Sequence, residues 1–377
     1  MDKKYDIILF GATGFTGKII SEYLSAHAGD ERISWAVAGR NRSKLEALAE
    51  TMSYRPDIVI ADVTDRSSLD AMTKDTVVLM NAAGPYDWYG QQVVESCLQN
   101  HCHYLDITGE PAFVYRCFTS YHEAAEKNNL CIVNCCGFDS IPADFATWMT
   151  VKKLPADKPK AVRLFIRTNA TFSGGTLTTA VNALYQQSQG NMPYLKLPRH
   201  PEAPKVSKAV HFNKDINAWA LPMPVVDPHI VKRSAYRLPE IYGKAFSYGQ
   251  FFVRSGFFKV VKTIFPIVVA GIFVRFSFFR NWLYNKFRPG DGPSPERRAV
   301  SRFEVICIGE AGSQKVKSVF AGGDPGYNET AKMFSEAAFT LLEKLKNKTA
   351  VFGVLTPVEA FGDHLVKRLK SKGITIE

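Results

Sequence analysis

A glycine-rich turn near the start of the chain constrains the fold more than any other feature. An apolar run of strand length, residues 5–10, leads into three glycines spaced three apart, Gly11, Gly14 and Gly17, and a helical pattern follows over 18–24. In such a turn the first glycine adopts backbone angles that side chains forbid, the second lets a diphosphate approach the main chain, and the third lets helix and strand pack closely. The helix N-terminus adds free N–H groups and the positive end of the helix dipole. The turn therefore predicts a dinucleotide site, with an ordinary strand-to-helix turn as the alternative.

Strands and helices continue to alternate up to about residue 136. The expected strands are Ile7–Phe10, Ile33–Ala38, Ile58–Ala61, Val77–Asn81, His103–Asp106 and Cys131–Cys135, with helical patterns between them, the last over 112–127. Strands joined by helical crossovers form a parallel, doubly wound sheet, so we expect an α/β Rossmann domain over 1–145. A cofactor should then lie across the carboxyl ends of the strands.

The end of the second strand indicates which dinucleotide binds. NAD sites usually place an acidic residue there, on the ribose 2′-hydroxyl. This chain instead has Arg40, followed by Arg42 and Lys44. An arginine can stack on adenine and pair with a 2′-phosphate, and a second cation would strengthen that contact. We therefore expect NADP (as NADPH in a reductase), with a solvated basic helix start as the alternative.

Further cofactor contacts should come from the ends of the other strands. Asp62 and Val63 close the third strand, small residues close the fourth, and Gly137 follows the sixth. The complete set of expected cofactor-binding residues is Gly11, Thr13, Gly14, Phe15, Thr16, Gly17, Arg40, Arg42, Lys44, Asp62, Val63, Ala82, Gly84, Tyr86 and Gly137.

The pattern changes after residue 145. Residues 161–168 alternate as in a half-exposed strand of an antiparallel sheet, and 299–309 with 315–321 form an expected hairpin. The proline-rich stretch 190–240 reads as strands joined by long loops. We therefore expect a second α/β domain over 146–326, built on a mixed, largely antiparallel sheet. Ser173-Gly174-Gly175 is either an anion cradle or a plain helix start.

The remaining boundaries follow from composition and periodicity. Residues 288–297 are rich in proline and glycine and are expected to be a mobile linker. Residues 327–377 contain an amphipathic helix, Glu329–Leu345, followed by strand, helix and short strand at 351–355, 357–369 and 374–376.

Charge and cysteine content limit the class of protein. The formal net charge is +11, and no acidic residue lies between Glu240 and Asp291. The seven cysteines have no regular spacing, and Met1 is followed closely by the first strand, so we expect an intracellular, cytoplasmic chain without a disulfide framework. His101 and His103 flank Cys102 without a second cluster, and no metal is expected.

The basic aromatic segment 242–287 is the second informative feature. Its longest uncharged run, Thr263–Val274, contains Pro266 and is short of the roughly 20 apolar residues that cross a bilayer. A helix lying in a membrane or lipid-droplet interface fits better, with cations on anionic headgroups and aromatic side chains beneath. The alternative is an internal lid over the substrate cleft or a homodimer contact. Nucleic acid is not expected, because no RNA- or DNA-binding motif accompanies the cations.

Several motifs together carry a family resemblance over nearly the whole chain. They are Gly-Ala-Thr-Gly-Phe-Thr-Gly at 11–17, Ala-Gly-Arg at 38–40, Gly-Pro-Tyr at 84–86 with Tyr89-Gly90, Asp-Ile-Thr-Gly-Glu at 106–110, Gly-Phe-Asp-Ser-Ile-Pro-Ala-Asp at 137–144 and Ser-Gly-Gly-Thr at 173–176. The chain resembles the saccharopine dehydrogenase-like oxidoreductases. Within them it is most similar to the branch of the trans-acting enoyl reductases and the lipid-droplet-associated animal homologue.

The resemblance implies a Rossmann domain, a second domain on a mixed sheet and a nicotinamide cofactor, and it leaves open whether the C-terminal segments return to the first domain. It leads us to expect an NADP-dependent oxidoreductase that reduces an acyl or polyketide lipid intermediate. The alternatives are a non-catalytic dinucleotide-binding protein of lipid surfaces and a saccharopine-type amino-acid dehydrogenase. The apolar segment 242–287 argues against a soluble, charged substrate.

Enoyl reduction needs a hydride on one carbon and a proton on its neighbour. Tyr86, beside the expected nicotinamide position, is the first candidate proton donor. Asp139 and Asp106 are alternatives, or groups that orient the ring. A wall against the cofactor is the structural alternative for Tyr86, and loop capping is the alternative for both aspartates.

Overall fold

The computed structural model describes residues 3–170, 181, 185, 189, 197–198, 200–223, 225–286 and 292–377. The chain forms two compact units. Met1–Ile141 and Tyr327–Lys372 make up the first, and Pro142–Gly326 and Gly373–Glu377 make up the second. The C-terminal helices therefore share a unit with the N-terminal strands. The motif at Ser173–Gly175 and the start of the expected linker, 288–291, lie outside the described residues.

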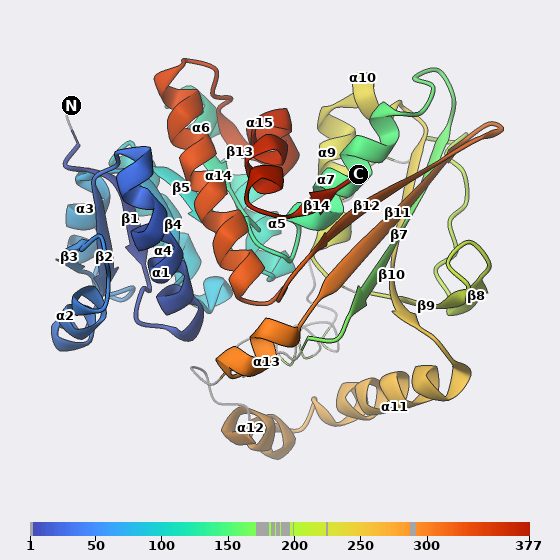
Figure 1. The fold of residues 1–377 in the computed structure, drawn as a ribbon, viewed down its shortest axis with the longest axis horizontal. Helices are drawn as coiled ribbons and strands as arrows, with labels where there is room; N and C mark the ends of the chain where they lie inside the picture. The colour runs from blue at the N-terminus through green and yellow to red at the C-terminus, as the bar shows by residue number, and fades with distance from the viewer. Residues whose placement is uncertain are drawn as a thin grey trace. The chain divides into compact units, whose positions relative to one another are not determined.

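The first unit contains a parallel sheet with the strand order β13-β6-β5-β4-β1-β2-β3 (Figure 1). Its strands are β1 Tyr5–Phe10, β2 Trp35–Gly39, β3 Asp57–Ile60, β4 Thr76–Asn81, β5 His103–Asp106, β6 Cys131–Val133 and β13 Gly353–Leu355. Every pairing in it is parallel. This confirms the doubly wound α/β fold, since apolar strands alternate with helices that cover both faces. The edge strand β13 comes from the C-terminal region.

Helices join these strands. They are α1 Phe15–Glu31, α2 Arg42–Glu50, α3 Arg66–Lys74, α4 Tyr86–Gln99, α5 Pro111–Ser120, α6 His122–Lys127, α14 Asn328–Lys346 and α15 Pro357–Ser371. The single helical pattern over 112–127 is divided between α5 and α6 at Tyr121. Thr356 begins α15 with a capping box to Glu359.

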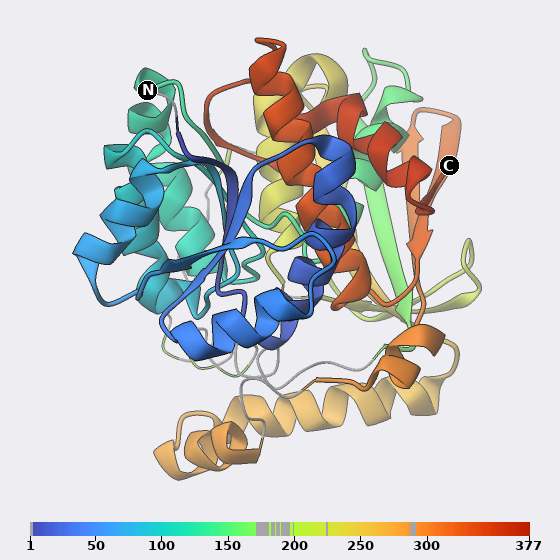
Figure 2. The same ribbon diagram turned by 60° about the vertical axis from the view of Figure 1, so that its left-hand side comes forward.

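A buried polar network fixes the C-terminal helices to α1. Arg368 on α15 donates to Glu336 on α14 at 2.6 Å and also pairs with Glu31 at the end of α1. The hydroxyl of Tyr23 donates to the other oxygen of Glu336 at 2.7 Å. Figures 1 and 2 both show α14 alongside α1. The network gives the buried Glu336 carboxylate the partners that a charge needs away from water.

The second unit is built on a mixed sheet with the order β14-β12-β11-β7-β10-β9-β8. Its strands are β7 Lys160–Thr168, β8 His211–Asn213, β9 Ala218–Pro222, β10 Phe246–Arg254, β11 Phe303–Ala311, β12 Gln314–Gly322 and β14 Thr375–Ile376. β7 and β10 pair in parallel, and the other pairs are antiparallel. The expected mixed, largely antiparallel sheet is confirmed.

The sequence-based reading of β7 was wrong in one respect. Residues 161–168 were expected to alternate as a half-exposed strand, which would place Phe165 on the exposed side with Arg163 and Arg167. Phe165 is instead fully buried and packs with Phe251 and Ile306. Both faces of the sheet are covered at this point, so that only Arg163, Arg167 and the terminal Thr168 of β7 keep partial exposure. Each of these arginines pairs with a glutamate on the neighbouring β11, namely Glu310 or Glu304.

The helices of the second unit correct two further expectations. They are α7 Ile141–Lys152, α9 Asp227–Arg237, α10 Pro239–Tyr242, α11 Phe257–Phe273, α12 Ser277–Lys286 and α13 Pro295–Val300. The stretch 190–240 was expected to hold strands and loops, but α9 is a helix that buries Ile230, Val231 and Ser234 on one face. Its proline lies in the first turn, where no N–H is needed. Likewise α13, capped by Ser294, occupies the end of the expected linker.

The basic aromatic segment 242–287 is divided between two environments. Residues 246–254 form β10, an internal strand between β7 and β9. The expectation that the whole segment faces a lipid surface is therefore wrong for this part, because Phe251 and Val253 of β10 belong to the core of the second unit. The remainder forms α11 and α12, which extend beyond the sheet (Figure 1).

Candidate functional site

The glycine turn follows β1, which pairs with β4 at the point where the strand order of the first sheet reverses. Gly11 has a positive φ of 87°, and a Cβ there would lie 2.8 Å from backbone atoms of Ala82 and Ala83. A Cβ on Gly17 would lie 2.2 Å from the carbonyl oxygen of Gly11. Both positions therefore admit only glycine. The turn occupies the strand-order switch point, where ligands of open α/β sheets bind.

Gly14 differs from the other two glycines. A Cβ there would meet only the Gly11 oxygen, at 3.3 Å, and the residue is exposed. Gly14 is the N-cap of α1, and among the described residues no side chain caps this helix. The first turn of α1 carries no acidic residue. An open N-terminus of this kind favours a phosphate, so the turn fits a dinucleotide diphosphate.

The side chains around the turn are partly buried. Thr13, Phe15 and Thr16 are all half-buried, and the ring of Phe15 packs edge-on against Tyr327 with centroids 4.9 Å apart. After β4, Ala82 is half-buried and Gly84 is exposed. Small residues at this edge leave the backbone of both strands open to a ligand.

Three cations follow β2. Arg40, Arg42 and Lys44 are exposed, and Arg42 makes a loose pair with Glu46 at 3.8 Å on its own helix. Asp62 follows β3, and hydrogen bonds from Thr64 lower the pKa of its carboxyl. The positive charge of Arg40 contributes to that shift. The cations thus lie at the edge where the adenosine half of a dinucleotide is bound in this fold.

Tyr86 is held in place by neighbouring strands. It is 6% exposed, and its hydroxyl donates to the carbonyl oxygen of Asn81 at 3.0 Å. Burial raises the pKa of Tyr86 well above its ordinary value, and the charges of Asp106 and Glu110 add to the effect. A phenol whose proton already has a backbone acceptor is better suited to forming a wall than to delivering a proton.

Asp106 also has structural partners. The carboxylate is fully buried and accepts from the backbone of Thr108 and Cys135 and from the side chain of Asn134, at 2.7–3.0 Å. Burial raises the pKa of Asp106 to about 6 despite these bonds. The group ties together the loops that follow β5 and β6.

Asp139 has a different environment. The residue is exposed, and within the described part of the chain its carboxylate has no hydrogen-bond partner. The carboxylate lies against Gly109, where a Cβ would approach to 3.0 Å. Burial of the carboxyl raises the pKa of Asp139 to about 6, although the residue as a whole is exposed. A carboxyl with a raised pKa and no hydrogen-bond partner among the described residues has the properties of a general acid.

Gly137 and Val63 complete the set of expected cofactor residues. Gly137 is buried, and a Cβ there would lie 2.9 Å from Thr330 on α14. The hydroxyl of Thr330 accepts from the backbone of Phe138 at 3.1 Å. Val63 is half-buried after β3. Gly137 therefore serves close packing on α14, which places the Asp139 loop.

Two residues of this site were missed from the sequence. Asn81 is buried, accepts from the backbone of Ala83 and donates to the hydroxyl of Tyr104. Glu110 accepts from the backbone of Tyr86 and Asp87 and so caps α4. Burial raises the pKa of Glu110 to about 7. No local pattern could reveal this cap, because Glu110 lies far along the chain from the helix it caps.

Comparison with known proteins gives the family. Residues 7–133 match the model of the saccharopine dehydrogenase NADP binding domain. A saccharopine dehydrogenase-like oxidoreductase of Bos taurus is 30% identical over 417 residues, covering 99% of this chain and 96% of the relative. This chain belongs to the saccharopine dehydrogenase-like oxidoreductases. Its first unit carries an NADP-binding domain, as the cations after β2 predicted.

Two other relatives and one structure extend the comparison. A Mycobacterium tuberculosis protein named as a candidate trans-acting enoyl reductase is 30% identical, covering 100% of this chain and 97% of the relative. A Caenorhabditis elegans protein named for its lipid-droplet location is 28% identical, covering 99% and 98%. The apo saccharopine dehydrogenase of Saccharomyces cerevisiae has the same fold, with a TM-score of 0.60 and 15% identity over 99% of both chains.

Among the described residues, no group of three or more His, Cys, Asp or Glu side chains is placed to hold a metal ion. His103, which flanks Cys102, is buried, and its Nδ1 accepts from the backbone of Cys131 at 3.0 Å. This is a structural contact between β5 and β6.

Proposed function

We propose that this oxidoreductase uses NADPH to reduce an unsaturated acyl or polyketide lipid intermediate, and that it works at a lipid surface. The exposed apolar face of α11 carries this proposal. Phe258, Val261, Phe265, Val268 and Ile272 recur at helical spacing, and they are between 48% and 89% exposed. A soluble, charged substrate gives no reason for such a face, whereas a lipid substrate does.

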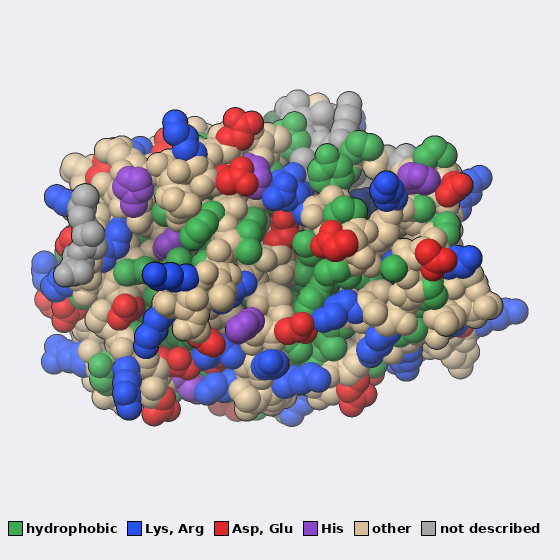
Figure 3. Space-filling model, turned by 90° about the horizontal axis from the view of Figure 1, so that it is seen from above, with side chains coloured by type: hydrophobic (Ala, Val, Ile, Leu, Met, Phe, Trp, Pro, Cys, Tyr) green, Lys and Arg blue, Asp and Glu red, His purple; other side chains and the backbone are tan. Residues whose placement is uncertain are grey.

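The charge of this region supports a lipid surface. Lys259 and Lys262 lie between these apolar residues, and Arg275 and Arg280 follow them, with no acidic residue in α11 or α12. On the face drawn in Figure 3, by comparison, acidic and basic side chains are interspersed. Cations beside exposed aromatic side chains match an anionic interface. No helix among the described residues is long and apolar enough to cross a membrane.

Within the first unit the proposed roles follow from the geometry of each residue. The N-terminus of α1 and Gly14 hold the diphosphate, with Thr13, Phe15 and Thr16 lining it. Arg40, supported by Arg42 and Lys44, holds the 2′-phosphate. The ring of Tyr86 forms a wall of the site, and Asp106 holds the loops after β5 and β6.

Asp139 is the proposed proton donor. Bound NADPH supplies the hydride to one carbon of the double bond. The protonated Asp139 carboxyl gives its proton to the neighbouring carbon, and the carboxylate of this exposed residue recovers a proton from solvent. Tyr86 and Asp106 are less suited to this step, because their polar atoms already have backbone partners.

Turnover and binding assays test this function separately. Purified protein is mixed with NADPH and a long-chain 2-enoyl thioester on anionic liposomes, and loss of NADPH absorbance is followed. We expect oxidation of NADPH and a saturated product by mass spectrometry. NADPH binding without turnover of any enoyl thioester would favour the non-catalytic alternative. Turnover with an amino acid and a 2-oxo acid instead would favour a saccharopine-type dehydrogenase.

A further inference from the structure

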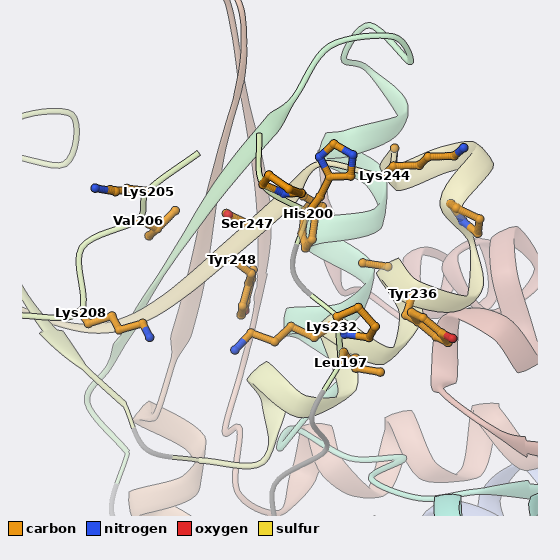
Figure 4. Close-up of a pocket in the computed structure, with 16 residues that line it drawn as sticks. Leu197, His200, Lys205, Val206, Lys208, Lys232, Tyr236, Lys244, Ser247 and Tyr248 are labelled. Atoms are coloured by element: carbon orange, nitrogen blue, oxygen red, sulfur yellow. The ribbon is translucent and has the colours of Figure 1, made fainter. Parts of the chain in front are cut away.

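A large cavity in the second unit takes no part in the proposed dinucleotide site. It measures about 980 Å³, toward the upper end of the roughly 300–1,000 Å³ typical of small-molecule sites. Parts of the segments 197–198 and 200–208, the helices α9 and α10, and the first half of β10 line it (Figure 4). A volume of this size holds a ligand well beyond a single ion.

The walls of this cavity are largely apolar. Leu197, Val206, Tyr236, Phe246 and Tyr248 contribute to the lining. Tyr248 is buried, and its hydroxyl donates to Gln250 at 2.8 Å, which in turn donates to Asp227. The polar end of this tyrosine is thus directed into the protein, so that its ring is left to face an apolar ligand.

Charged lining residues of the cavity are all basic. Lys205, Lys208, Lys232 and Lys244 line it together with His200, and no acidic residue is among its described lining. In Figure 4 the side chains of Lys208 and Lys232 point toward each other, beneath Tyr248, whereas those of Lys205 and Lys244 point away. The cavity therefore combines one converging pair of ammonium groups with two divergent ones.

No acidic side chain of the described part of the chain pairs with Lys208 or Lys232. Burial lowers the pKa of the Lys232 ammonium, and the charge of Lys208 lowers it further, with no carboxylate acting in the opposite direction. Burial lowers the pKa of the neighbouring His229 to about 4, and the positive charge of Lys232 contributes to that shift. The acid in the first turn of α9, Asp227, is buried and accepts from Gln250. Both lysines are exposed at the rim of the cavity, so their ammonium groups remain open to an anionic ligand whose apolar part lies along the cavity wall.

We propose that this cavity binds a phosphate monoester carried on an apolar chain, with the phosphate between Lys208 and Lys232 and the chain along the apolar wall. Lysine binds phosphate as a compact point charge, whereas planar carboxylates favour the bidentate fork of arginine. A phosphate monoester carries a charge of about −1.5 to −2 near neutral pH, which matches two ammonium groups. The site stands independently of the proposed reductase activity, since its ligand is recognised without any redox step.

Calorimetric titration of the full-length protein, saturated with NADPH so that the dinucleotide site is filled, tests this proposal. The probes are octyl phosphate, inorganic phosphate and the uncharged octyl glucoside. We expect one octyl phosphate to bind per chain, more tightly than inorganic phosphate and octyl glucoside. If inorganic phosphate bound as tightly as octyl phosphate, the cavity would be a site for free phosphate, and the proposed role of the apolar chain would be wrong. If the uncharged octyl glucoside bound as tightly as octyl phosphate, the proposed role of the lysine pair in binding the phosphate would be wrong.

Two matched double variants locate the binding. Lys208→Gln/Lys232→Gln should weaken octyl phosphate at least about tenfold, since a hydrogen bond to a charged group contributes about 1.5–3 kcal/mol. Lys205→Gln/Lys244→Gln removes the same charge from the same cavity, but from side chains that point away, and should change affinity less than about twofold. An equal loss in both variants would show a diffuse charge effect and overturn the converging pair.

Thermal unfolding shows whether a loss of octyl phosphate binding reflects the missing lysines or a loss of folding. Removing two cations that repel each other breaks no ion pair, so Lys208→Gln/Lys232→Gln should unfold at the same or a higher temperature than the unaltered protein. If that variant were destabilised, the single variant Lys208→Gln replaces it in the titration. An unchanged affinity for octyl phosphate in a folded variant would overturn the proposal.

Discussion

The turn at residues 11–17 and the helix α11 are both open to solvent, but they expose opposite kinds of surface. The turn presents backbone at an uncapped helix N-terminus beside the exposed Gly14. α11 presents a row of large apolar side chains, led by Phe258 at 89% exposure. Water satisfies the first surface and not the second. The turn can therefore remain hydrated between ligands, whereas the apolar face gains free energy by being covered.

The two regions also differ in how many residue types the surrounding atoms allow at each position. A Cβ at Gly17 would lie 2.2 Å from the backbone of Gly11, so this position is fixed by atoms a few residues away. Along α11, a Cβ at Gly271 would meet nothing within 4 Å. Substitutions in the turn should therefore have all-or-none effects on binding or folding. Substitutions on α11 should have graded effects that add along the face.

The largest effect is expected in the turn. Gly14→Val should abolish NADP binding while the protein remains folded, because the new side chain meets only the Gly11 oxygen at 3.3 Å and otherwise fills the space open to the diphosphate. Isothermal titration gives the affinity and circular dichroism the unfolding transition. Gly17→Val is the contrasting variant and should fail to fold. Normal NADP affinity in a folded Gly14→Val protein would show that the turn is not the cofactor cradle.

The second effect concerns the chemical step. Asp139→Asn should lower kcat for enoyl reduction by about 10²–10⁴, the usual contribution of a positioned acid, and leave NADPH affinity unchanged. In the unaltered enzyme the acid must be protonated. Because the pKa of Asp139 is raised to about 6, kcat/KM should fall about tenfold per pH unit above that value, and the variant should lose this dependence.

The stability of this variant provides its control. The pKa of Asp139 lies above its ordinary value of 3.8, so ionisation between pH 3.8 and about 6 disfavours the folded state. Asp139→Asn removes that contribution and should not lower the unfolding temperature at neutral pH. If Asp139→Asn kept the pH profile of the unaltered enzyme, another group would be the acid. Tyr86 would be the first to test, by the substitution Tyr86→Phe.

The contrast between the turn and α11 also explains what the sequence could reveal. Strands β1 to β6 and the mixed character of the second sheet were predictable, since period and apolar runs are local signals. The division of 242–287 was not, because Phe251 in β10 and Phe258 in α11 belong to one aromatic run. Only the pairing of β10 with β7 and β9 decides that Phe251 is 1% exposed while Phe258 is 89% exposed.

The same limit applies to the candidate site. Cofactor-binding roles for Gly11, Gly14 and Arg40 could be predicted from the sequence, because spacing along the chain indicates such roles. The ranking of Tyr86, Asp106 and Asp139 could not. It depends on hydrogen bonds between strands, such as that from Tyr86 to Asn81 and those that Asp106 accepts from the loop after β6.

The third effect tests the apolar face. Phe258→Ser/Phe265→Ser should weaken binding to anionic liposomes at least about tenfold, because each fully buried phenylalanine contributes about 1.5–3 kcal/mol. Flotation at low and high salt measures the change, and high salt should release the unaltered protein only partly, since screening removes the cationic contribution alone. Trp88→Ser is the control, because Trp88 is 62% exposed but lies in the first unit. Protein that stays entirely with the aqueous fraction at low salt would make α11 an internal lid or a dimer contact.

The smallest effect is expected at the edge of the dinucleotide site, where a single contact distinguishes two cofactors. Arg40 is exposed at the end of β2, and its charge acts on Asp62, which already accepts two hydrogen bonds from Thr64. The guanidinium is therefore available to a 2′-phosphate. Arg40→Ala should weaken NADP by about 1–3 kcal/mol, the value of a charge-assisted contact that Arg42 and Lys44 partly replace.

NAD provides the control for this last variant, since it lacks the 2′-phosphate and should bind the unaltered and the Arg40→Ala protein with similar affinity. Titration of both cofactors with both proteins completes a thermodynamic cycle, and its coupling energy isolates the contact between Arg40 and the 2′-phosphate. Raising the salt concentration should reduce this coupling, because the arginine is exposed. Equal loss of NAD and NADP would instead place Arg40 against the adenine ring, which both cofactors share.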